Sequence, residues 1–308
     1  MDVGSKIKKV LAVWFLCVSL ILSTAVLGHA YSSILSFGDS LTDNGPADGF
    51  GIQHFTNGQV WVEDMASHYS APLLDMAYGG ATTGVNDPAA GSPILGLQWQ
   101  VSKYLINISP VVPNNTLITV WAGANDFIKA FDVPGETIGA PNVAAANVVL
   151  AIQALDNAGG QNFLIPNLPD IGKTPAFLPT PYAATATLWS QQFNADLAAD
   201  MLTLESNPLY SADHFYTLDV YTLINQLINN PSMYASLGYN FTNVTNSGNN
   251  NPPAGYLFWD GIHPSAEGHA LLAYLAENDL QSVPEPATML LLGLGLVGLA
   301  GVRRKFKE

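Results

Sequence analysis

Three residues of the chain have the side chains and the sequence context that nucleophilic catalysis requires. Ser40 follows an apolar run in Phe-Gly-Asp-Ser-Leu-Thr-Asp (37–43), which predicts a buried strand that ends at a tight turn. A serine hydroxyl needs a base to take its proton and a group that orients the base. Asp260 and His263 lie three residues apart in a loop with Gly and Pro, so the carboxylate could hold one imidazole nitrogen and leave the other for Ser40. Taken alone, Ser40 fits better as a turn serine that caps a helix, and Asp260 and His263 as ordinary loop residues.

The predicted elements would bring such residues to one edge of a sheet. Strands and helices alternate at the spacing of crossover connections, which predicts an α/β fold: a three-layer sandwich with a central parallel sheet. We expect strands at 33–37, 73–78, 116–121, 162–165 and 214–220. We expect helices at 59–69, 94–108, 143–158, 181–204, 220–229 and 265–280. Ligands of such folds bind beyond the carboxyl ends of the strands, where Gly38, Gly79-Gly80 and Gly123 fall.

Four short segments, in this order, resemble the sequence blocks of the GDSL, or SGNH, hydrolase family. They are FGDSLTDNG (37–45), AYGGATT (77–83), GAND (123–126) and DGIHP (260–264), and the stretches 55–61 and 167–172 are also similar. The resemblance runs from Ile34 to about Leu280 and points to the lipase/esterase branch with lecithinase- and haemolysin-like members. It implies a flavodoxin-like fold, with Ser40 as nucleophile, His263 as base and Asp260 as the acid that orients the base.

The same resemblance implies an oxyanion hole. Its donors would be the backbone amides of Ser40 and Gly80 and the side-chain amide of Asn125, with Gly79 as the alternative to Gly80. Glycine lets the backbone come close to a substrate, and one such donor is typically worth about 2.7–4 kcal/mol in the transition state. The chain has no G-x-S-x-G, so the nucleophile elbow of α/β-hydrolases is absent.

The amino terminus has the layout of a secretory signal peptide. Lys6, Lys8 and Lys9 precede an apolar run at 10–27, and a small-residue exit ends at Ala30. We therefore expect residues 1–30 to be a signal peptide that signal peptidase removes, with an uncleaved anchor as the alternative.

The carboxyl terminus resembles the PEP-CTERM sorting signal of Gram-negative bacteria. Val-Pro-Glu-Pro (283–286) precedes an apolar run at 287–302 and the basic residues 303–305. The resemblance implies transient anchoring in the membrane and removal by an exosortase on the way to the cell surface or the extracellular space. An ordinary anchor is the alternative. The G-x-G-x-x-G match at 293–298 follows no strand, so we reject a dinucleotide site. Between the two signals, 31–282 would be the hydrolase domain and 283–308 the sorting segment.

Composition restricts the ligands. The chain has a formal net charge of −14, and only Lys103, Lys129 and Lys173 are basic between the two signals. Such a domain should repel nucleic acid and anionic lipid, which favours neutral substrates. Its single cysteine, Cys17, lies in the signal peptide, so no cysteine chemistry is expected in the domain. We expect no cofactor and no metal, because the alternative cation site at Asp39, Asp43 and Asp48 does not have the spacing of a calcium loop.

These patterns predict a secreted serine hydrolase that cleaves carboxylic esters through an acyl-enzyme on Ser40. Its partners would be an ester substrate, either a lipid or an acylated small molecule or glycan, and the two processing enzymes. The alternatives are a polysaccharide O-acetyl esterase or acyltransferase and, from another class, a non-catalytic matrix or adhesion protein. His269 should be structural, as should Asp39. The aromatic residues that could line an acyl pocket, or else belong to the core, are Phe50, Phe55, Trp61 and Trp259.

Overall fold

The computed structural model of the protein describes residues 31–45, 53–85, 96–132, 135, 137–245 and 254–281. The predicted signal peptide and sorting segment lie outside these residues. Within the part of the chain that is described, none of the helices combines the length and the apolar character that crossing a bilayer requires.

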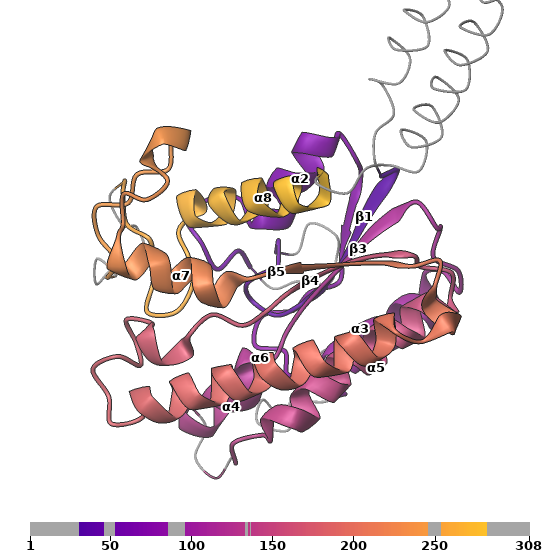
Figure 1. The fold of residues 1–308 in the computed structure, drawn as a ribbon, viewed down its shortest axis with the longest axis horizontal. Helices are drawn as coiled ribbons and strands as arrows, with labels where there is room; N and C mark the ends of the chain where they lie inside the picture. Colours follow the sequence, from indigo (N-terminus) through magenta and orange to yellow (C-terminus); the bar gives the residue numbers. More distant parts are fainter. Residues whose placement is uncertain are drawn as a thin grey trace, which may run out of the picture.

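A five-stranded parallel sheet forms the centre of the molecule (Figure 1). Its strands are β1 (Ser33–Gly38), β2 (Leu73–Asp75), β3 (Thr116–Trp121), β4 (Asn162–Pro166) and β5 (His214–Leu218), in the spatial order β2-β1-β3-β4-β5. The inner strands β1 and β3 pair along their whole length, up to Gly38 opposite Trp121. Both are rich in apolar residues and nearly fully buried, as strands covered on both faces must be.

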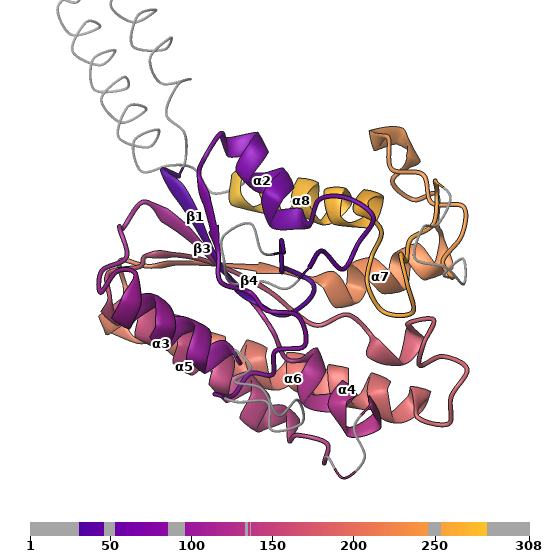
Figure 2. The ribbon, with the colours of Figure 1, turned by 180° about the vertical axis from the view of Figure 1, so that it is seen from behind.

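Helices cover both faces of the sheet, which confirms the predicted three-layer sandwich (Figures 1 and 2). One face carries α2 (Trp61–Tyr69) and α8 (Ala266–Gln281), which pack on each other. The other carries α3 (Leu97–Asn107), α5 (Pro141–Asn157) and α6 (Ala183–Glu205). Two further helices, α4 (Ala124–Asp132) and α7 (Val220–Asn229), follow directly after β3 and β5.

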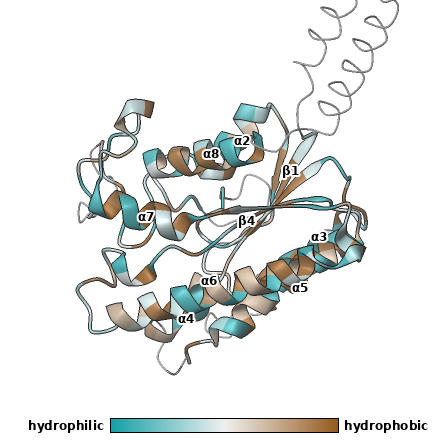
Figure 3. Cartoon of the chain, in the orientation of Figure 1, coloured by the Kyte–Doolittle hydropathy of each residue, from teal (hydrophilic) through white to brown (hydrophobic). Residues whose placement is uncertain are grey.

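Apolar residues gather where the layers meet (Figure 3). In α2 the buried positions are Trp61, Val62, Met65 and Tyr69, the spacing of one helix face. The indole of Trp61 meets that of Trp121 edge to face at 5.7 Å and is fully buried. Trp61 therefore belongs to the core, the second of the two roles expected from the sequence, and not to an acyl pocket.

Several element bounds differ from the sequence-based prediction by a few residues, with β5 ending at Leu218 and not at 220, and two differences lie close to Ser40. The second strand is expected to continue to Tyr78, but β2 ends at Asp75; beyond it the Met76 and Tyr78 amides still donate to β1, while the Ala77 amide donates to the Asp75 carboxylate. We expected no helix at 124–132, where α4 forms. The signal for α4 was present, since Phe127, Ile128 and Phe131 have the i, i+1, i+4 spacing of a helix face.

Candidate active site

Ser40 lies in the turn that follows β1. Gly38 ends the strand so close to β3 that an added Cβ would collide with the Trp121 carbonyl oxygen, which explains why glycine stands there. The amides of Thr42 and Asp43 both donate to the Asp39 carbonyl oxygen at 3.0 Å, and the Leu41 amide donates to Asp39 Oδ1 at 3.0 Å. These bonds fold the chain back on itself and hold Ser40 at the carboxyl edge of the sheet.

Ser40, His263 and Asp260 form one chain of hydrogen bonds. Ser40 Oγ lies 2.8 Å from His263 Nε2, and His263 Nδ1 lies 2.7 Å from Asp260 Oδ2. The other carboxylate oxygen of Asp260 accepts the backbone amides of Ile262 and His263, each at 2.7 Å. Burial by itself would raise the pKa of Asp260, but the bonds from His263 and these amides outweigh it and hold the pKa below its usual range. The carboxylate is therefore ionised and faces the imidazole.

Two further polar groups face the same cavity as Ser40. Gly80 has a φ of +81°, which favours glycine, and lies on the loop after β2. Asn125 lies in the first turn of α4, where its Nδ2 donates to the Ala81 carbonyl oxygen at 3.1 Å. The Gly79 amide, in contrast, donates to Asp43 Oδ2 at 2.7 Å. Because that amide is already bound, the geometry favours Gly80 over Gly79 as an oxyanion donor.

The cavity beside Ser40 has a volume of about 180 Å³. Besides Ser40, His263, Gly80 and Asn125, it is lined by Asp39, Leu41, Phe55, Ala124, Ile128, Pro169, Ile171, Thr174 and Ile262. The Phe55 ring packs on the His263 ring at 5.1 Å, as one of the predicted pocket aromatics. Trp259 lies farther, at 6.3 Å from the His263 ring, and is not among the lining residues. Phe50 is outside the described residues.

Burial perturbs two carboxyl groups close to the cavity. It raises the pKa of Asp39 to about 7, although the bond from the Leu41 amide opposes this. It raises the pKa of Asp126 to about 6, against the two bonds that Thr83 donates at 2.9 and 2.8 Å. Both groups therefore exchange a proton near neutral pH, in a place where their negative charge acts on the site.

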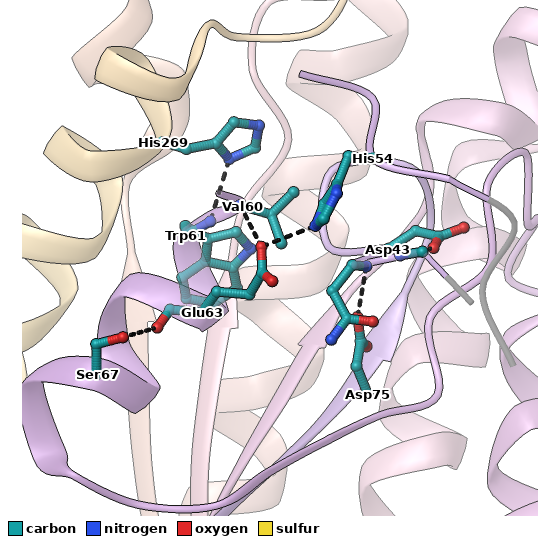
Figure 4. Close-up of polar contacts among 10 residues, drawn as sticks. Asp43, His54, Val60, Trp61, Glu63, Ser67, Asp75 and His269 are labelled. Carbon is teal, nitrogen blue, oxygen red and sulfur yellow. Dashed lines mark hydrogen bonds and ion pairs between the residues drawn. The ribbon is translucent and has the colours of Figure 1, made fainter. Parts of the chain in front are cut away.

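Among the described residues, none of the other histidines is bonded to Ser40. His269 is buried in α8, where its Nδ1 accepts the Trp61 amide at 3.4 Å (Figure 4), and burial lowers the pKa of His269 to about 3, which keeps the ring neutral. His54 and His68 pair with Glu63 and Glu277. The described residues include no group of three or more His, Cys, Asp or Glu side chains suited to a metal ion. Asp48, part of the cation site considered from the sequence, is not among them.

Sequence reasoning missed Gln100, which supports the end of β1. Its Oε1 accepts the Gly38 amide at 3.0 Å, and its Nε2 donates to the Gly38 carbonyl oxygen at 2.8 Å. Gln100 thus binds both backbone groups of Gly38, whose carbonyl oxygen also accepts the Tyr78 amide at 3.1 Å. A signal existed, because Gln100 is the polar member of an otherwise apolar stripe on α3 with Leu97, Val101 and Tyr104.

Comparisons with known proteins identify the class. The family model described as GDSL-like Lipase/Acylhydrolase matches residues 34–276, so the chain belongs to this family of ester-cleaving enzymes. The PEP-CTERM protein-sorting motif matches residues 282–305.

Individual relatives agree with that assignment, and a solved structure has the same fold. The chain is 29% identical over 291 residues to a thermolabile hemolysin of Vibrio parahaemolyticus, covering 82% of this chain and 63% of that protein. It is 26% identical over 165 residues to Lipase 1 of Photorhabdus luminescens, covering 52% of this chain and 26% of that one. The chain thus spans less than two thirds of these relatives. A variant of an acetyl-xylooligosaccharide esterase from Geobacillus stearothermophilus has the same fold, with a TM-score of 0.52 at 14% identity over 82% of this chain and 96% of that one.

Proposed function

We propose that the protein is an exported hydrolase that cleaves carboxylic esters through an acyl-enzyme on Ser40. The observation that carries the proposal is the unbroken hydrogen-bond chain from Ser40 through His263 to Asp260, at the edge of a cavity that Gly80 and Asn125 also line. In a member of an acylhydrolase family, this arrangement has the nucleophile, base and orienting acid that ester cleavage by serine needs.

The reaction would run in two halves. His263 Nε2 takes the Ser40 proton while Oγ attacks the ester carbonyl carbon, and the carbonyl oxygen becomes an oxyanion. The amides of Ser40 and Gly80 and Asn125 Nδ2 would donate to that oxyanion. His263 then returns the proton to the departing alcohol and leaves the acyl group on Ser40. Water, deprotonated by His263, attacks the acyl-enzyme; the carboxylic acid leaves and Ser40 regains its proton.

We propose that the enzyme acts after export. We infer that signal peptidase removes residues 1–30, that 31–282 is the hydrolase domain and that 283–308 is the sorting segment. The match of the PEP-CTERM motif at 282–305 supports processing by an exosortase and delivery to the surface of a Gram-negative bacterium or to the extracellular space.

The size of the cavity bears on the substrate. Pockets for small molecules commonly measure about 300–1,000 Å³, whereas the cavity beside Ser40 has about 180 Å³. Its lining is mostly apolar, which suits the acyl part of a neutral ester. We therefore propose a short acyl group as the preferred one. Relatives named as lipases, and a phosphatidylcholine-sterol acyltransferase of Aeromonas hydrophila, support lipid esters as the wider class.

A second candidate follows from the same small cavity: removal or transfer of acetyl groups on a polysaccharide. It uses the same residues, and the two candidates differ in the alcohol part of the ester.

Activity-based labelling tests the proposal. The purified protein should take up one fluorophosphonate label and hydrolyse p-nitrophenyl acetate and butyrate faster than laurate. Ser40→Ala should abolish both, whereas Ser211→Ala, at an exposed serine in the turn before β5, should change neither. Absence of label and of hydrolysis in the wild type would leave the non-catalytic alternative, and equal labelling of Ser40→Ala would exclude Ser40. Release of acetate from acetylated xylan, compared with fatty acid from phosphatidylcholine, separates the substrate candidates.

A further inference from the structure

The Asp43 carboxylate joins the loop of Ser40 to the loop of Gly80. Asp43 is fully buried, and its backbone amide donates to the Asp39 carbonyl oxygen within the turn that carries Ser40. Its Oδ1 accepts the Gly45 amide at 2.8 Å, and its Oδ2 accepts the Gly79 amide at 2.7 Å. Figure 4 shows Asp43 in the region of Asp75, the last residue of β2. One ionisable side chain thus connects two segments whose relative placement decides where the oxyanion donors stand.

The loop that carries Gly80 needs such a connection. β2 ends at Asp75, but the Met76 and Tyr78 amides still donate to the Ser36 and Gly38 carbonyl oxygens of β1, at 2.8 and 3.1 Å. The next amide, that of Gly79, donates to the Asp43 side chain instead, and the Ala81 amide donates to the Tyr78 carbonyl oxygen at 2.9 Å. The Gly79 amide is bound by Asp43 immediately before Gly80, which has a positive φ. A bond from an N–H to a carboxylate is stronger and shorter than one to a neutral acceptor.

We propose that Asp43 is a positioning residue that sets the Gly80 amide at the distance from Ser40 that the oxyanion requires. The inference rests on the proposed ester hydrolysis. Asp43 is not among the residues that line the cavity, so it acts through Gly79 and does not touch the substrate. Its effect should appear in the transition state, where the oxyanion forms, and not in the binding of the neutral ester.

Asp75 provides a matched control for a merely structural role. Its side chain is also buried, and its two oxygens accept two backbone amides of the same two loops, Asn44 at 2.9 Å and Ala77 at 3.0 Å. Removing either carboxylate leaves two amides without their acceptor, so both variants should lose thermal stability. Of the two carboxylates, Asp43 is the one that accepts the amide of Gly79, the residue before Gly80.

The experiment compares Asp43→Ala with Asp75→Ala in the full protein, at a temperature where circular dichroism shows both folded. For Asp43→Ala we expect kcat for p-nitrophenyl acetate to fall about 10- to 100-fold with KM changed less than about threefold, less than removal of an oxyanion donor causes. The inhibition constant of an alkyl boronic acid, which forms an anionic tetrahedral adduct on serine, should weaken by the same factor as kcat. For Asp75→Ala, kcat should stay within about threefold of wild type. An equal loss of kcat in both variants, or a loss in Asp43→Ala that appears in KM alone, overturns the proposal.

If Asp43→Ala does not fold, a second comparison tests the proposal. Asparagine offers a single acceptor oxygen, so Asp43→Asn must release either the Gly45 or the Gly79 amide. Hydrogen exchange, measured by NMR, shows which one is released. We expect kcat to fall if the Gly79 amide is released and to stay if it remains protected; the opposite pairing overturns the proposal. A wild type without hydrolysis or label would instead contradict the proposed function, and an active wild type with an unaffected Asp43→Ala would contradict only the role of Asp43.

Discussion

His263 Nε2 lies 2.8 Å from Ser40 Oγ, although 223 residues separate the two in the chain. The fold brings the two residues together, because Ser40 follows β1 at the carboxyl edge of the sheet and His263 lies in the loop before α8 at the same edge. Within that loop, the Trp259 amide donates to the His263 carbonyl oxygen at 2.9 Å and closes a tight turn around Asp260. The geometry of the site is therefore a property of the whole domain.

Replacing Asp260 by Asn should keep the shape of this turn and remove the orienting charge. One side-chain oxygen would still accept the Ile262 and His263 amides. The new NH₂ group would face His263 Nδ1 and favour the tautomer whose Nε2 carries a proton and accepts none. We expect kcat to fall about 10⁴-fold, as in serine proteases, with a Tm close to that of wild type. A loss below about tenfold would show that Asp260 is not the orienting group.

Asp39 should cost the protein stability at alkaline pH. Its pKa rises from 3.8 to about 7 on folding, so the folded state holds a proton that the unfolded state has lost between these values. The unfolding free energy contributed by Asp39 is therefore complete below pH 4 and is lost as pH rises through about 7. Asp39→Asn, whose oxygen can still accept the Leu41 amide, should be more stable than wild type at pH 8, by on the order of 1–3 kcal/mol. Urea unfolding at pH 8 and pH 4 measures this, and the difference should vanish at pH 4.

Asp219 is the control of opposite sign. Burial favours a higher pKa, but bonds from Thr222 and Asn167 hold the pKa of Asp219 below its usual range. Asp219→Asn should therefore be less stable than wild type at neutral pH, and the gap should narrow as pH falls below the usual range of a carboxyl group. If the stability differences of Asp39→Asn and Asp219→Asn from wild type changed in the same direction with pH, burial would not explain the pKa of Asp39 together with hydrogen bonding for that of Asp219.

The fold could be predicted because its signals are local. Apolar runs that end at glycine turns mark the strands, and the bounds of β3 and α7 agree with the expectation to the residue. The contact of His263 with Asp260 could also be expected, because three residues of a tight loop fix it. The hydrogen bonds that join the loops could not be predicted from the sequence. Asp43 with Gly79 and Gln100 with Gly38 pair residues 36 and 62 positions apart, and a buried carboxylate or amide gives no hint of its partner until the strands are placed.

Ile171 should limit the length of the acyl group. It is buried in the short 3₁₀ helix Ile171–Lys173 and lines the cavity. Ile171→Ala should enlarge the cavity and raise the ratio of kcat/KM for hexanoate over acetate by about 3- to 10-fold, since each buried CH₂ contributes about 0.8 kcal/mol. The expected loss of stability is about 2–4 kcal/mol. Ile152→Ala, equally buried but in α5 away from the cavity, should lose similar stability and leave the ratio unchanged.

Lys129 should support the reaction through its charge. It stands four residues after Asn125 on α4, on the same helix face, and its Nζ would lie 3.9 Å from a Cβ placed on Gly80. The carboxyl groups of Asp39, Asp126 and Asp260 oppose a developing oxyanion, and the ammonium of Lys129 offsets them. We expect Lys129→Met to lower kcat/KM about 3- to 10-fold at low salt and less in 0.5 M NaCl, where screening weakens the charges of all groups. Lys103→Met, whose ammonium lies over the Trp99 ring on α3, should have no such effect. A loss that does not depend on salt would assign Lys129 to packing and leave the backbone and Asn125 donors as the source of oxyanion stabilisation.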